Sequence, residues 1–102
     1  MVDSMLSTEE VIDYLTRNKN LLHESFGVTR IGLFGSFAHK RQTTDSDIDI
    51  VVELEKDKKN IHSFFGLKRF LEAGLGRKVD LGLEHCLKPA VREKNKDRIL
   101  YV

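Results

Sequence analysis

Two aspartates, Asp47 and Asp49, stand two residues apart where an aliphatic run begins. Successive side chains of a β-strand point to opposite faces, so both carboxylates would share one face, with Cα atoms roughly 6.6 Å apart. Carboxylates at that spacing can bridge a pair of divalent ions, which lie roughly 3.5–4 Å apart in two-metal sites. The same alternation places Val51 and Glu53 beside the aspartates, and it sends the remaining aliphatic side chains to the opposite face: Ile48, Ile50, Val52 and Leu54.

A third carboxylate, Asp80, lies inside another aliphatic run, KVDLGL. If this strand neighbours the first and buries its aliphatic face under the same helices, Asp80 joins the face of Asp47 and Asp49. Three such charges would repel one another strongly, and divalent cations would remove that conflict. Hard oxygen ligands favour Mg²⁺ or Mn²⁺ over zinc. Asp80 is then either a general base or a shared metal ligand, and its position alone does not separate the two roles.

Gly35 and Ser36 follow a short strand and are expected to form a turn. Backbone N–H groups at such a turn form an anion site, and glycine lets a phosphate approach closely. The Ser36 hydroxyl can add a hydrogen bond to a phosphate oxygen. A triphosphate held there would point at the metals, which predicts nucleotidyl transfer, an in-line attack on the α-phosphate that expels pyrophosphate.

Gly35-Ser36 followed after ten residues by Asp47-Ile48-Asp49 resembles the signature of the minimal nucleotidyltransferases, small relatives of the DNA polymerase β superfamily. The run IGLFGSFAHKRQTTDSDIDIVVEL is similar to that family along its length, and Asp80 matches its third carboxylate. The resemblance implies a polymerase β-like α/β fold with a mixed three- to four-stranded sheet and flanking helices. It also implies two Mg²⁺ ions, with Mn²⁺ as a substitute, and ATP as substrate. Many members carry Arg-Gly where this chain has His39-Lys40, so we assign these two residues to the nucleotide site with Gly35 and Ser36.

Short members of this family often pair with a helical HEPN-domain protein in toxin–antitoxin systems. The resemblance therefore implies an antitoxin that transfers AMP from ATP to a tyrosine of an RNase toxin. A non-catalytic subunit that neutralises its partner by occlusion is one alternative. A nucleotidyltransferase that acts on a small molecule or an RNA end is another.

Other interpretations of these residues are weaker. Asp45, Asp47 and Asp49 match the first positions of a calcium loop, but the required Gly and Glu are replaced by Ile50 and Lys56. A solvated acidic strand edge is disfavoured because aspartate is depleted in strands. The basic stretch 88–98 is either a solvated helix face or a surface for a partner or RNA.

The composition points to one small domain spanning residues 1–102. With 40% hydrophobic and 32% charged residues, the chain can bury a single modest core and is not of the disordered class. Its net charge of +1 predicts no whole-surface attraction to nucleic acid or to an anionic membrane. A single cysteine excludes an internal disulfide, and we expect a cytoplasmic protein without a membrane span.

Alternating helices and strands must position these residues, which predicts an α/β or α+β class. We expect helices over 8–22, after a capping box at Ser7 and Glu10, and over 61–73, with Gly74 and Gly76 as its end. A helical turn over 37–40 and a last helix opened by Pro89 are also expected. The predicted strands are 28–34, 48–54 and 78–83, and the final ILYV is either a fourth strand or a packing tail.

Overall fold

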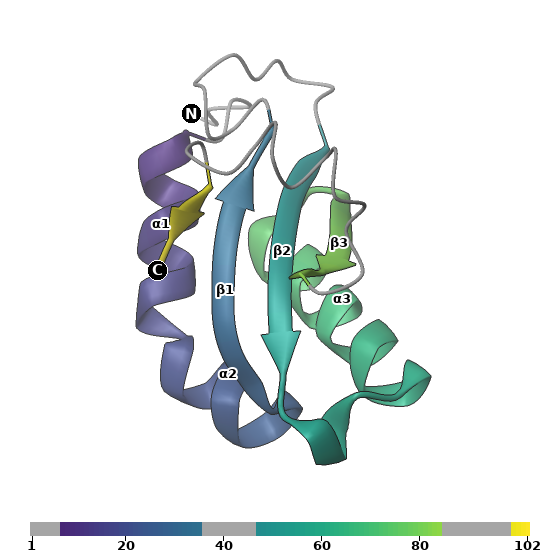
Figure 1. The fold of residues 1–102 in the computed structure, drawn as a ribbon. Helices are drawn as coiled ribbons and strands as arrows, with labels where there is room; N and C mark the ends of the chain where they lie inside the picture. Colours follow the sequence, from purple (N-terminus) through teal and green to yellow (C-terminus); the bar gives the residue numbers. More distant parts are fainter. Residues whose placement is uncertain (1–6, 36–46, 85–98) are drawn as a thin grey trace.

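The structure, a computed structural model, describes residues 7–35, 47–84 and 99–102. Its sheet has the strand order β3-β2-β1-β4, in which β2 and β3 are parallel and the other neighbours are antiparallel (Figure 1). The predicted α/β class with a mixed sheet is therefore confirmed, and the final segment forms the fourth strand. In chain order the elements are α1 (Thr8–Arg17), α2 (Lys19–Phe26), β1 (Val28–Phe34), β2 (Ile48–Leu54), a 3-10 turn η1 (Lys56–Lys58), α3 (Ile61–Leu75), β3 (Val79–Leu83) and β4 (Leu100–Tyr101).

The N-terminal helical region is two helices and not the single helix predicted over 8–22. The capping box is present, since Ser7 accepts from the Glu10 N–H and Glu10 accepts from the Ser7 N–H. The break comes at Asn18, whose side-chain amide donates to the Tyr14 carbonyl oxygen at 2.9 Å. Such local side-chain bonds compete with the helix ladder, so the chain turns there before α2 begins. Helix α2 ends at Gly27, which has a left-handed φ of 72°.

Helix α3 runs two residues beyond the predicted end at Ala73 because Gly74 is a packing residue and not a stop. A Cβ atom at Gly74 would overlap the Tyr14 hydroxyl, so glycine there lets α1 and α3 approach closely. Gly76 ends the helix with a φ of 69°, and its N–H donates to the Glu72 carbonyl oxygen at 2.8 Å.

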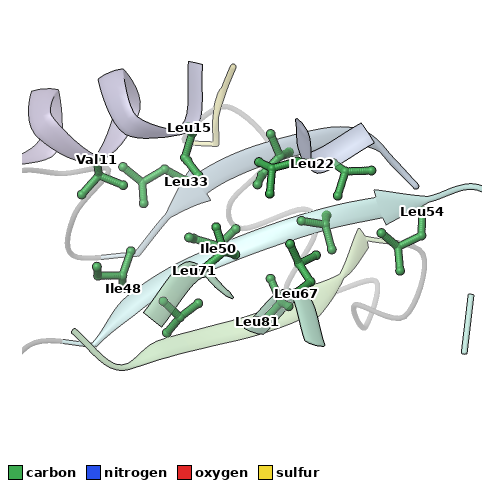
Figure 2. Packing of buried hydrophobic residues seen from close by; sticks show 14 residues of the cluster. Val11, Leu15, Leu22, Leu33, Ile48, Ile50, Leu54, Leu67, Leu71 and Leu81 are labelled. Carbon is green, nitrogen blue, oxygen red and sulfur yellow. The ribbon is translucent and has the colours of Figure 1, made fainter. Parts of the chain in front are cut away.

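The core fills the space between the helices and one face of the sheet (Figure 2). The strands contribute their alternate residues, as the sequence pattern predicts, and the helices contribute an apolar stripe. Its fully buried members include Val11, Leu15, Leu22, Ile31, Leu33, Ile48, Ile50, Val52, Leu67 and Leu71.

The opposite face of the sheet carries the aspartates, and none of the described helices packs on it (Figure 1). Val51 lies on this face and yet is fully buried, which the alternation alone does not predict. Its neighbour on β1 is Gly32, where a Cβ atom would lie 2.6 Å from Ile99 and 3.0 Å from Tyr101. The C-terminal residues therefore pack across β1 at its only side-chain gap on this face.

Two expected elements, the turn over 37–40 and the helix opened by Pro89, lie outside the described residues. Within the described part of the chain, no helix combines the length and apolar character that a bilayer crossing requires.

Candidate active site

The sheet topology brings the predicted acidic residues together at one end of the sheet. Because β1 and β2 are antiparallel, the last residue of β1, Phe34, lies opposite Asp49 near the start of β2. Because β2 and β3 are parallel, Asp49 lies beside Asp80, the second residue of β3. The expectation that the two acidic strands are neighbours with a shared face is therefore confirmed.

Gly35, which directly follows β1, lies against Asp49 of this pair. Its φ of 74° is a left-handed conformation that side chains disfavour. A Cβ atom at this position would overlap Oδ2 of Asp49 and lie 2.9 Å from its Cγ. Only glycine lets the backbone turn directly against the carboxylate, so the turn residue and the acid form one structural unit.

The three acids interact electrostatically. The pKa of Asp49 is raised to about 6 by partial burial, first of all, together with the charges of Asp80 and Asp47 and a hydrogen bond with Asp80. Asp47 and Asp80 are exposed, whereas Asp49 is half-buried. The fold therefore holds a carboxyl where its ionised form is disfavoured unless a positive charge is near.

This donor set fits a hard divalent cation. Oxygen donors from two neighbouring strands, with like charges that a cation would neutralise, match the preference of Mg²⁺ and Mn²⁺. Across residues 7–35, 47–84 and 99–102, however, no three His, Cys, Asp or Glu side chains form a ready-made metal cluster. The assembled part is the pair Asp49 and Asp80, with Asp47 close enough for its charge to act on Asp49.

Part of the predicted nucleotide site cannot be placed. Gly35 lies against Asp49, as the phosphate-turn prediction requires, but Ser36, His39 and Lys40 lie outside the described residues. Their assignment to the nucleotide remains a prediction.

A second polar cluster on the same face was not anticipated from the sequence. The Arg30 guanidinium lies 4.0 Å from the ring centroid of Tyr101 and 3.4 Å from a carboxylate oxygen of Glu84. This cluster corresponds to no sequence motif, because Arg30 lies on β1, Tyr101 on β4 and Glu84 just after β3. The strand alternation that places Arg30 with Gly32 on the open face is the one signal that could have indicated it.

The chain is similar in sequence and in fold to known proteins of one family. The sequence model of a family described as "Nucleotidyltransferase domain" matches residues 15–102. The protein adenylyltransferase MntA of Thermococcus cleftensis is 38% identical over 99 residues, which cover 97% of this chain and 99% of that protein. A solved structure assigned to a minimal nucleotidyltransferase superposes with a TM-score of 0.82 and 28% identity, covering 96% of this chain and 98% of that one.

A further solved structure is similar in fold. It contains the tri-AMPylated HEPN toxin of Shewanella oneidensis in complex with its MNT antitoxin. The match has a TM-score of 0.63 and 21% identity, and it covers 89% of this chain and 70% of that chain.

Proposed function

Because the chain belongs to the nucleotidyltransferase domain family, we propose that it transfers AMP from ATP to a tyrosine of a HEPN-domain RNase toxin and thereby acts as the antitoxin. The family membership and the MntA relative support a nucleotidyltransferase enzyme. The MntA relative supports a protein as the acceptor, and the tri-AMPylated toxin complex is the reason for naming a HEPN protein.

The observation that carries the proposal is the register Asp49–Asp80 with Gly35 packed on Asp49. Asp47, Asp49 and Asp80 would hold two Mg²⁺ ions, or Mn²⁺, which stabilise negative charge on the reacting oxygens when bound. The backbone of Gly35 and the Ser36, His39 and Lys40 side chains would hold the triphosphate beside these carboxylates.

The chemistry is a substitution at the α-phosphorus of ATP. The tyrosine oxygen forms a bond to that phosphorus, the bond to the bridging oxygen breaks, and pyrophosphate leaves. The phenolic proton needs an acceptor, and our candidate is Asp80, which is exposed. Asp49 lies between Phe34 and Asp80 in the sheet and fixes the position of the charged centre.

The test is intact-mass spectrometry of the co-purified toxin partner after incubation with ATP and Mg²⁺. We expect the partner to gain the mass of one or more AMP groups. Asp49→Asn should abolish the gain while the protein stays folded by circular dichroism. Asp57→Asn, on the exposed turn η1, is the matched control and should retain transfer.

Two results would contradict the proposal in different ways. Labelling by Asp49→Asn would overturn the catalytic assignment of that carboxylate. Neutralisation of the toxin by an Asp47→Asn/Asp49→Asn double variant, without added mass, would instead show that the chain acts by occlusion.

A further inference from the structure

The short connection between α3 and β3 is held at both ends by one residue, Glu72. Its carbonyl oxygen accepts the Gly76 N–H at 2.8 Å, which ends the helix. Its carboxylate oxygen Oε2 accepts the Val79 N–H at 2.9 Å, which begins the strand. Glu72 is half-buried and lies seven residues before the amide that it binds.

The Val79 amide needs this partner because of where β3 lies. Successive backbone amides of a strand point to opposite sides, and the Lys78 carbonyl already accepts the Ile48 N–H on the β2 side at 2.9 Å. The Val79 N–H therefore points away from β2. In the described part of the chain, β2 is the one strand next to β3, so no described strand lies on the side to which the Val79 N–H points. Val79 is only 2% exposed, so an unpaired amide there would be costly.

We propose that Glu72 is a positioning residue for the active site: its carboxylate replaces the missing neighbour strand at Val79 and so fixes the next residue, Asp80, opposite Asp49. The sequence supports this role, since Asp80 directly follows Val79, whose amide is bound by Glu72. The inference rests on the proposed function, because it assumes that Asp80 is a metal ligand.

Substitutions separate this role from general stabilisation. Glu72→Ala removes the acceptor, whereas Glu72→Gln keeps a carbonyl oxygen that can accept the same N–H. Asn60→Ala is the matched control, because Asn60 Oδ1 accepts the Ser63 N–H at 2.8 Å at the other end of α3 and has no link to Asp80. If Glu72→Ala does not fold, Glu72→Asp tests the same bond with a carboxyl that is one methylene too short.

The measurement is Mn²⁺ binding to the ATP-free protein, followed by electron paramagnetic resonance of the unbound ion. We expect Glu72→Ala to weaken binding about tenfold, the lower end of the effect of partners that orient metal ligands. Glu72→Gln and Asn60→Ala should bind as the wild type does. In an Asp80→Asn background, Glu72→Ala should cause no further loss, because the residue acts through Asp80.

The positioning role would be overturned if Glu72→Ala bound Mn²⁺ with wild-type affinity. It would also be overturned if Glu72→Ala weakened Mn²⁺ binding as much in the Asp80→Asn background as in the wild type. Either result would leave the proposed function intact. Equal Mn²⁺ binding by the wild type and Asp80→Asn would also overturn the positioning role, since Asp80 would then not be a ligand. The proposed function is tested separately, by the gain of AMP mass on the toxin partner.

Discussion

The two faces of the sheet differ in the side chains that they carry, although these side chains alternate along the same strands. On the helix-covered face, Ile48, Ile50 and Val52 are fully buried. On the open face, the positions between them hold Asp49 and Val51, and Asp49 lies beside Asp80. The covered face gains free energy from burial, whereas the open face keeps carboxylates together at an electrostatic cost. A change of one position along β2, from Ile48 or Ile50 to Asp49, therefore moves from a residue that stabilises the fold to one that we propose serves the chemistry.

The largest expected effect lies on the covered face. Leu71→Ala, on α3, should lower the free energy of unfolding by about 2–5 kcal/mol, because it removes a fully buried side chain and leaves a cavity. Urea denaturation measures this loss. Transfer activity per folded molecule should stay close to wild type, since Leu71 does not lie on the acidic face. A large fall in activity without a fall in stability would contradict the division between the faces.

Gly35 tests the open face, and Gly76 provides its control. Both have left-handed φ values, but a Cβ atom at Gly76 would meet nothing within 4 Å. Gly76→Ala should therefore cost only the conformational strain, about 1–2 kcal/mol. Gly35→Ala adds the overlap with Asp49 and should also abolish AMP transfer, because the acid must move.

Thermal unfolding and the transfer assay measure both glycine variants together. Equal loss of activity in Gly35→Ala and Gly76→Ala would show that strain alone, and not the displacement of Asp49, is responsible.

The pKa of Asp49 gives the open face a distinctive pH dependence. Its folded value of about 6 is above the ordinary value of 3.8, so the fold favours the protonated form. The corresponding stability is present below pH 4 and is lost as the pH rises through 6. In metal-free protein, Asp49→Asn should therefore raise the melting temperature at pH 7.5 but not at pH 4.

Solvent screens this half-exposed carboxylate, so we expect a shift of about 4–8 °C, the effect of roughly 1 kcal/mol in a domain of this size. Added Mg²⁺ should raise the melting temperature of the wild type at pH 7.5 and leave that of Asp49→Asn nearly unchanged. A lower melting temperature for Asp49→Asn at both pH values would show that the ionised carboxylate stabilises the fold.

The strand pattern was sufficient to predict the acidic face. The alternation of Ile48, Asp49 and Ile50 separates the two faces in the sequence, and an aliphatic run around Asp80 does the same for β3. The strand order was not predicted: that the two acidic strands are neighbours was a condition of the prediction, and the structure meets it. Gly35 was also recognisable, because glycine after a strand marks a turn at which side chains are excluded.

Features that depend on tertiary contacts were not predictable in this way. The continuation of α3 through Gly74 depends on its close contact with Tyr14 on another helix. The break at Asn18 is local by contrast, since its side chain bonds to the Tyr14 carbonyl oxygen four residues earlier, and the apolar spacing that predicted one helix did not reveal it. The close approach of Ile99 and Tyr101 to Gly32 joins residues that are nearly seventy positions apart. Local propensity carries no information about such distant neighbours.

The parallel pairing of β2 with β3 also determines when the candidate site can form. The β1–β2 contact joins segments that are close along the chain, whereas β3 reaches β2 only after α3 has crossed over the sheet. Closing the longer loop costs more entropy, so we expect β3 to dock late in folding. A nascent or partly folded chain would then present Asp49 without Asp80. Under the proposed function, metal affinity and the use of ATP would thus appear only once β3 has docked, late in folding.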